Sequence, residues 1–285
     1  MTDFEIVARD GVDQLGEGPL WRVADRSLWW VDIVAPALNR LTVATGAVER
    51  WAMPEPIGWV VERAGGGLLA GFRSGIAALD PDSLAIDFWV APEPDRPHNR
   101  LNDAKVDATG RLWFGSKDDR DLDDSGALYA MGADRRPRRH DDGYRVANGP
   151  AFSLDGRFLY HADSGRRVVY RFAVDEDGAL AERVPFLTFD PAWGYPDGMT
   201  VDAQDCLWVA HWGGGAISRF DPEGRRMQTV ALPATNVTSC TFGGAGLDRL
   251  YVTSAAMTSP GMPADGALFV LEVGVGGRPA TAFAG

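Results

Sequence analysis

The sequence repeats one short pattern at a nearly constant interval, and this repeat limits the possible folds more than any other feature. Each copy places a turn before a leucine or aromatic residue and a run of small apolar residues. Successive markers of the pattern are 40, 44, 47, 48 and 43 residues apart. A period of this length is typical of repeat architectures such as β-propellers. The six markers are Trp29, Leu69, Trp113, Tyr160, Trp208 and Tyr251.

Each repeat also has the composition of several short strands. A second β-rich run follows most markers, as at residues 168–172 and 216–220. The 34 glycines and 18 prolines leave little room for long helices. The repeats therefore predict an all-β fold, a six-bladed β-propeller of four-stranded antiparallel blades that occupies residues 1–285 as a single domain. A large β-sandwich is the alternative, but it gives no reason for a fixed period.

The segment at residues 4–8 precedes the first repeat and consists mostly of apolar side chains. A closed ring leaves each blade only short exposed edges. We therefore predict that this segment adds the outer strand of the last blade and closes the ring.

The chain is acidic, with a formal net charge of −12 at pH 7. This charge repels nucleic-acid phosphates, so no nucleic-acid partner is expected. No apolar run approaches the ~18 residues that span a membrane, and the first residues lack a charged-then-apolar leader. Cys206 and Cys240 lie apart on apolar segments, as buried thiols do in a reducing compartment. These features predict a cytoplasmic protein without a membrane partner, as a monomer or weak homo-oligomer.

Oxygen-bearing side chains recur eleven or twelve residues before the markers, where each innermost strand is expected to begin. Equivalent positions on innermost strands lie at one height around the central channel. Carboxylates and amides there are costly to desolvate unless a cation neutralises them, and oxygen ligands suit Ca²⁺, Mg²⁺ or Mn²⁺. Any one of these residues could simply form a turn, but their common phase favours a site. The four residues are Glu17, Asn102, Asn148 and Asp197.

Five segments resemble, in chain order, motifs of the senescence marker protein/gluconolactonase/luciferin-regenerating enzyme-like family. They are residues 15–21 (LGEGPLW), 99–107 (NRLNDAKVD), 148–153 (NGPAFS), 195–199 (YPDGM) and 238–244 (TSCTFGG). The resemblance implies a six-bladed propeller with one catalytic divalent metal ion at the top of the channel. It leaves Ca²⁺, Zn²⁺, Mn²⁺, Mg²⁺ and Fe²⁺ open as the metal.

The resemblance also assigns roles to individual residues. Glu17, Asn148 and Asp197 match the metal ligands of the family. Arg100 and Asn102 match residues that hold the hydroxyl groups of a sugar lactone.

This chain departs from the family pattern at residues 115–119. Relatives commonly have Gly-Thr-Met followed by acidic residues, whereas this chain has Gly-Ser-Lys-Asp-Asp. The departure puts an acidic substrate contact of some relatives in doubt. It makes Lys117 a further candidate substrate-binding residue that alters which lactone fits.

These assignments predict a metal-dependent hydrolase that opens sugar aldonolactones, either pentono- or hexono-lactones, to aldonic acids. The cation would polarise the lactone carbonyl, and Asp197 would serve as general base as well as ligand. One alternative is a metal-dependent esterase that acts on organophosphates or aromatic lactones. The other is a propeller that binds Ca²⁺ without turnover.

Overall fold

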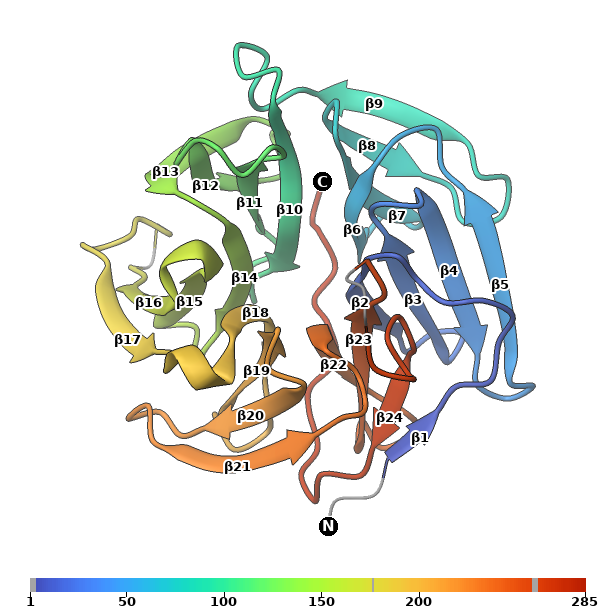
Figure 1. The fold of residues 1–285 in the computed structure, drawn as a ribbon. Coiled ribbons are helices and arrows are strands. Elements are labelled where there is room, and N and C mark those ends of the chain that lie inside the picture. The colour runs from blue at the N-terminus through green and yellow to red at the C-terminus, as the bar shows by residue number, and fades with distance from the viewer. Residues whose placement is uncertain (1–3, 176, 258–260) are drawn as a thin grey trace.

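The computed structural model describes residues 4–175, 177–257 and 261–285. Within these ranges, six four-stranded antiparallel sheets form a ring around a central channel (Figure 1). The predicted six-bladed propeller is therefore confirmed. Helical structure in the same ranges is limited to two 3-10 turns, η1 (Ser164–Arg166) and η2 (Pro191–Trp193). No helix there is long or apolar enough to cross a membrane.

In the first five blades the strands follow one another in sequence from the channel outward. Blade 1 comprises β2 (Gly16–Arg22), β3 (Ser27–Asp32), β4 (Ala37–Thr42) and β5 (Ala47–Ala52). Blade 2 comprises β6 (Ile57–Glu62), β7 (Leu68–Phe72), β8 (Ile76–Leu79) and β9 (Ile86–Val90). Blade 3 comprises β10 (Asn99–Val106), β11 (Leu112–Asp118), β12 (Gly126–Met131) and β13 (Pro137–Tyr144). Blade 4 comprises β14 (Ala147–Phe152), β15 (Phe158–Asp163), β16 (Val168–Ala173) and β17 (Val184–Thr188). Blade 5 comprises β18 (Tyr195–Val201), β19 (Leu207–Trp212), β20 (Ala216–Phe220) and β21 (Arg226–Ala231).

The sixth blade joins the two ends of the chain, as the sequence predicted. It consists of β22 (Asn236–Gly243), β23 (Arg249–Ala255), β24 (Phe269–Leu271) and β1 (Phe4–Ile6), and β1 is its outermost strand. An ion pair reinforces this closure: Arg9 contacts Asp13 at 2.7 Å and also donates to the Gly266 carbonyl.

All six repeat markers lie on the second strand of their blades and are buried. Large apolar side chains there fill the space between neighbouring blades. One apolar cluster, for example, joins Trp29 of blade 1 to Val60 and Phe72 of blade 2. Each such side chain contributes roughly 1.5–3 kcal/mol through burial. The repeated aromatic residues of the sequence thus stabilise the contacts between blades.

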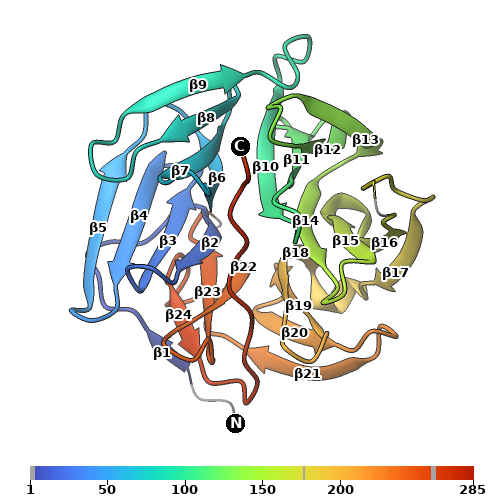
Figure 2. The ribbon, with the colours of Figure 1, turned by 180° about the vertical axis from the view of Figure 1, so that it is seen from behind.

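The last residues of the chain cross one end of the channel, a feature that the sequence analysis missed. Backbone hydrogen bonds tie Gly277 to Leu247 of blade 6, and Phe283 to Glu62 of blade 2. The segment lies in the middle of the ring in views from both sides (Figures 1 and 2). Phe283 is fully buried. This segment closes what we call the lower end of the channel, and the opposite end is called the upper end.

Candidate active site

The innermost strand of every blade is irregular where it passes the centre of the channel. In β2 the register shifts between Glu17 and Leu20, and in β14 it shifts between Asn148 and Ala151. Similar shifts occur in β6, β10, β18 and β22. Such bulges break the strict alternation of a strand and re-aim its side chains. Gly149 serves this geometry directly, because its φ of 73° is one that other residues rarely adopt.

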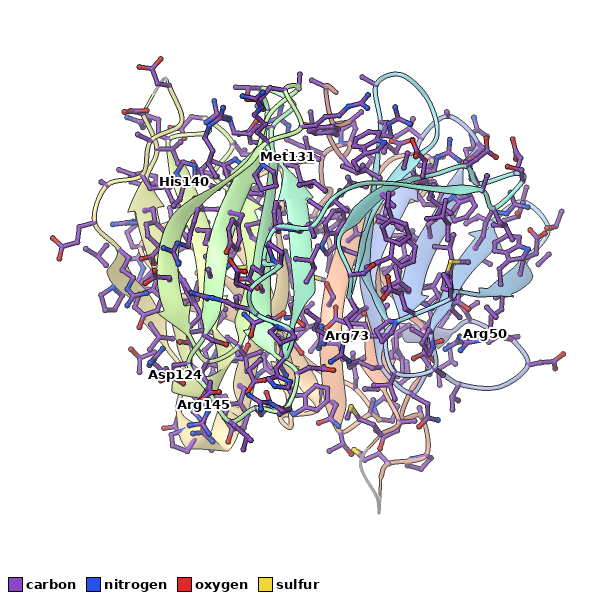
Figure 3. The ribbon with its side chains drawn as sticks, turned by 90° about the horizontal axis from the view of Figure 1, so that it is seen from above. Arg50, Arg73, Asp124, Met131, His140 and Arg145 are labelled. Atoms are coloured by element: carbon purple, nitrogen blue, oxygen red, sulfur yellow. The ribbon has the colours of Figure 1, made fainter. Side chains whose placement is uncertain are left out.

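The upper ends of these strands surround a cavity of about 660 Å³. This volume lies within the usual range for small-molecule sites. Figure 3 shows the ring edge-on, with the upper end of the channel toward the bottom of the picture, where Arg73 and Arg145 lie, and the lower end toward the top, on the side of Met131 and His140. All six of the predicted site residues line this cavity: Glu17, Arg100, Asn102, Lys117, Asn148 and Asp197. Ser239 shares their phase in the sequence but lines the lower cavity instead.

Two buried carboxylates dominate the electrostatics of the cavity. Glu17 is 6% exposed and Asp197 is 4% exposed. Burial and the nearby Asp197 raise the pKa of Glu17 well above its usual value. Burial and the negative charge of Asp103 likewise raise the pKa of Asp197 well above its usual value. In the described part of the chain, Oδ1 of Asp197 is buried and has no hydrogen-bond partner.

Asp103 contributes a third buried acid close to this pair. Burial raises its pKa to about 6, although the positive charge of Lys105 and the backbone amides of Ala104 and Gly149 oppose the shift. Its Oδ1 accepts a hydrogen bond of 2.7 Å from the Ala104 amide. Asp103 follows Asn102 in β10, yet it lines the lower cavity.

The two amides are fixed by a chain of hydrogen bonds across three blades. Asn102 Nδ2 donates to Asn148 Oδ1 at 2.6 Å and to the Ala147 carbonyl at 2.7 Å. Asn148 Nδ2 donates to Ser164 Oγ, which donates to the Pro196 carbonyl at 2.5 Å. Asn102 therefore donates both of its amide hydrogens to other atoms of the protein. The carbonyl oxygen of Asn148 keeps a second lone pair that could face a ligand.

Arg100 is held rigidly beside these amides. Its Nη1 donates to Asn102 Oδ1 at 2.6 Å, and its Nε donates to Asp119 Oδ1 at 2.8 Å. The second oxygen of Asp119 accepts from Arg73 at 2.9 Å. Asp119 thus orients Arg100 from the rim of the cavity. The Nη2 group of Arg100 has no hydrogen-bond partner among the described residues, so it can donate to a bound molecule.

Lys117 lies at the end of β11, where its ammonium contacts Asp121 at 2.6 Å. The residue is only 7% exposed. Burial and the nearby Arg100 lower its pKa, whereas Asp121 opposes the shift. Lys117 therefore lines the same cavity as the other predicted residues and has an acidic partner in Asp121.

Sequence reasoning missed several polar residues of the cavity wall, among them Arg145 and Ser164. Both lie in connections around β14 and β15 rather than on the innermost strands that carry the repeated phase. No motif marked either residue. Ser164 follows β15 directly, and only the packing of neighbouring blades brings it between Asn148 and Pro196.

The residues present are compatible with one divalent cation. In the described residues, no group of three or more His, Cys, Asp and Glu side chains could hold a metal ion. Two carboxylates and one amide, Glu17, Asp197 and Asn148, nevertheless line the same cavity. The unpartnered Oδ1 of Asp197 is the kind of atom that a cation would satisfy. Hard divalent ions bind such oxygen donors.

The fold and this site define a class: a six-bladed propeller with buried acids and amides at one end of its channel. Comparison with known proteins is more specific. The model of the SMP-30/Gluconolactonase/LRE-like family matches residues 15–256. The chain belongs to this family, and the resemblance seen in its motifs is confirmed.

Curated relatives and solved structures support this assignment along the whole chain. The 6-deoxy-6-sulfogluconolactonase of Pseudomonas putida is 34% identical, covering 95% of each chain. Regucalcin of Danio rerio is 36% identical, covering 96% of each. A luciferin-regenerating enzyme aligns over 100% of both chains with a TM-score of 0.93 and 29% identity. A calcium-binding protein, regucalcin, from Agrobacterium tumefaciens has a TM-score of 0.94 and 25% identity, covering 99% of this chain and 97% of its own.

Proposed function

We propose that this protein is a divalent-metal-dependent lactonase that hydrolyses sugar lactones to aldonic acids. The observation that carries the proposal is the buried pair Glu17 and Asp197, with one orphaned carboxylate oxygen, in the same cavity as Arg100. Two names among the relatives agree with it, since one is a sulfogluconolactonase and the family model includes gluconolactonase.

Glu17, Asn148 and Asp197 would hold the cation. A bound divalent cation supplies a Lewis acid that polarises the lactone carbonyl and lowers the pKa of a nearby water molecule. Asn148 is oriented for this role by Asn102 and Ser164, which bind its two amide atoms. Oriented ligands of this kind fix the geometry of a metal site before metal binds.

Asp197 is the candidate general base. A carboxylate has two oxygens, so Asp197 could bind the cation through one of them and take a proton from the attacking water through the other. The same carboxyl group could then return the proton to the leaving ring oxygen.

Arg100 is the candidate substrate-orienting group. Its Nε and Nη1 are fixed by Asp119 and Asn102, which leaves Nη2 to donate to a ring hydroxyl or to the acid formed. Asn102 has only its carbonyl oxygen left for a hydroxyl group, so it acts mainly by holding Arg100 and Asn148.

The test is acid release from pentono- and hexono-lactones in a pH-stat, with the spontaneous rate subtracted. We expect turnover that disappears with a chelator and returns with added metal. Asp197→Asn should lower kcat at saturating metal by about 10²-fold, the scale of a lost general base. Asp82→Asn, at an exposed turn, is the matched control.

Four results would contradict all or part of the proposal. Chelator-resistant turnover would exclude a metal role, and full recovery of Asp197→Asn at saturating metal would leave Asp197 a ligand only. Faster turnover of an aromatic ester or organophosphate would favour the esterase alternative. Metal binding without any turnover would favour a calcium-binding propeller.

A further inference from the structure

The upper cavity is lined by cationic side chains as well as by the carboxylates of Glu17, Asp119, Asp121 and Asp197. Three cationic residues line it: Arg100, Lys117 and Arg145. Arg100 is already engaged by Asp119 and Asn102. Lys117 and Arg145 therefore remain to be explained.

Lys117 and Arg145 line the same cavity from neighbouring blades. An isolated antiparallel bridge pairs Lys117 with Val146, the residue that follows Arg145. This bridge joins the end of β11 to the beginning of blade 4, across the boundary between two blades. The backbones that carry the two cations are therefore brought together only in the folded ring.

Arg145 has space for its side chain because residue 165 is glycine. A Cβ atom at Gly165 would lie 2.6 Å from Cδ of Arg145, so the aliphatic part of the arginine packs directly on the glycine. The guanidinium of Arg145 makes no hydrogen bond or ion pair within the described residues. A cation placed on a cavity wall without a partner is available to a ligand.

The acid beside Lys117 is easily displaced. The side chain of Asp121 is 58% exposed, whereas that of Lys117 is 9% exposed. An ion pair with one such exposed member contributes little, typically about 0–1 kcal/mol. The backbone of Asp121 also has a positive φ of 56°, which is uncommon for a residue other than glycine. A substrate anion could replace this carboxylate on the buried ammonium.

We propose that the preferred substrate is a sugar lactone carrying an anionic group, which Lys117 and Arg145 bind in place of Asp121. The group is a carboxylate, phosphate or sulfonate on the part of the sugar distant from the lactone carbonyl. This inference rests on the proposed lactonase function and adds the charge of its substrate. Charge-assisted hydrogen bonds from two cations are the usual means of holding such a group.

The experiment compares kcat/KM for a neutral hexonolactone with kcat/KM for its 6-phospho, 6-sulfo and 6-carboxylate analogues. Wild-type protein should prefer at least one charged lactone by about 10-fold or more. Lys117→Met, which keeps a long side chain but removes the charge, should lower the charged-to-neutral ratio by about 10- to 100-fold, the value of one charge-assisted hydrogen bond. Arg145→Met should lower the same ratio, mostly through KM.

Two further variants sharpen the test. Asp121→Asn should raise the charged-to-neutral ratio by a few-fold, because it removes the competing carboxylate. Arg157→Met deletes an exposed charge in the turn between β14 and β15 and should leave the ratio unchanged. Comparison of kcat/KM among the three charged analogues shows which anion Lys117 and Arg145 bind best.

The outcomes separate this inference from the function on which it depends. The inference would be overturned if wild-type protein hydrolysed neutral lactones as well as charged ones and Lys117→Met left the charged-to-neutral ratio unaltered. The proposed lactonase function would then still stand. No turnover of any lactone by metal-loaded wild-type protein would overturn both. A lower charged-to-neutral ratio in Asp121→Asn would show that Asp121 binds the substrate itself.

Discussion

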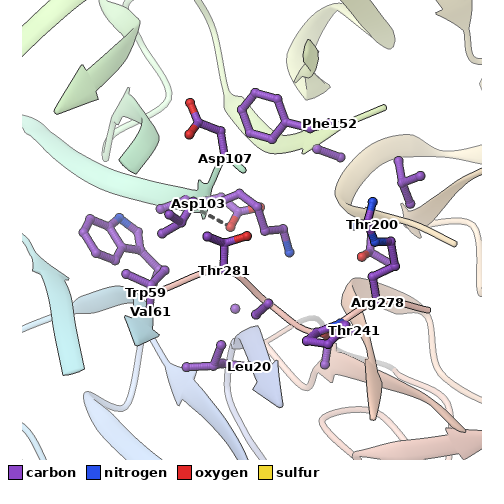
Figure 4. A pocket seen from close by; sticks show the side chains of 18 of the residues that line it. Leu20, Trp59, Val61, Asp103, Asp107, Phe152, Thr200, Thr241, Arg278 and Thr281 are labelled. Atoms are coloured by element: carbon purple, nitrogen blue, oxygen red, sulfur yellow. Dashed lines mark hydrogen bonds between the residues drawn. The ribbon is translucent and has the colours of Figure 1, made fainter. Parts of the chain in front are cut away.

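The two ends of the central channel are built from the same innermost strands, yet they differ in what their side chains do. The upper cavity, of about 660 Å³, contains Glu17 and Asp197. The lower cavity, of about 400 Å³, is lined mainly by apolar residues and threonines and by the crossing C-terminal segment (Figure 4). Two adjacent residues of β10 line different cavities: Asn102 lines the upper cavity and Asp103 lines the lower one.

This difference shows how one repeat can provide both a site and a stable frame. The upper end leaves buried charge uncompensated, which is costly for folding but useful for binding. The lower end instead buries Phe283 and pairs backbone groups of the C-terminal segment with several blades. Four predictions test this difference between the two ends, beginning with the largest expected effect.

Removing a charge at the upper end should have the largest effect. Glu17→Gln should abolish most metal retention after dialysis and lower kcat/KM by about 10³-fold, because several kcal/mol of metal-assisted stabilisation are lost. Glu62→Gln makes the same change at the lower end of an innermost strand, beside Arg22, and should retain metal. Metal analysis measures the retained metal in both variants, and the pH-stat assay measures their kcat/KM. Full metal retention in Glu17→Gln would show that Glu17 is not a metal ligand.

Opening the lower end should affect stability rather than chemistry. Phe283→Ala should lower the free energy of unfolding by about 3–5 kcal/mol, as expected for a fully buried aromatic side chain. Phe88→Ala, at a half-exposed site, should cost much less. Urea unfolding provides the measurement. If kcat of the folded Phe283→Ala protein also fell 10-fold, the two ends would be coupled and the comparison would fail.

The buried acids should make the metal-free protein less stable as pH rises. Glu17, Asp103 and Asp197 have raised pKa values in the folded state, so that state binds more protons than the unfolded chain above pH ~4. The free energy of unfolding must then fall with rising pH. For Asp103, with a pKa of about 6, the fall is complete slightly above pH 6 and amounts to about 3 kcal/mol.

Unfolding with urea at pH 4.5, 6 and 8, in chelator and in excess metal, checks this dependence. We expect the metal to cancel most of the loss at pH 8, and Asp103→Asn to flatten the curve between pH 4 and 6. Equal stability of the metal-free protein at all three pH values would show that these acids are not stabilised in their protonated form.

The smallest effect is expected from an exposed contact of the lower end. Arg278 lines the lower cavity and donates one hydrogen bond of 3.3 Å to the Leu154 carbonyl. Arg278→Ala should change the free energy of unfolding by less than about 1 kcal/mol. Lactone turnover should not change. A marked loss of turnover would mean that the lower end contributes to the reaction.

The sequence by itself determined the ring and the phase of its polar side chains. The repeated spacing marked the six blades, and the run at residues 4–8 indicated the closure that β1 completes over Phe4–Ile6. The position of Glu17, Asn148 and Asp197 before their markers grouped three residues that line one cavity, although Ser239, which has the same phase, lines the other. Periodic features are readable in this way because each blade repeats the same local geometry.

Only the tertiary structure decided the contacts that do not repeat. Asp119 joins Arg100 to Arg73, and Ser164 joins Asn148 to blade 5. Lys117 pairs with Val146, next to Arg145, across a blade boundary, and the C-terminal segment closes the lower end. These contacts link residues from different blades through loops of unequal length. Their partners depend on where each loop folds back, which a local pattern in the sequence does not encode.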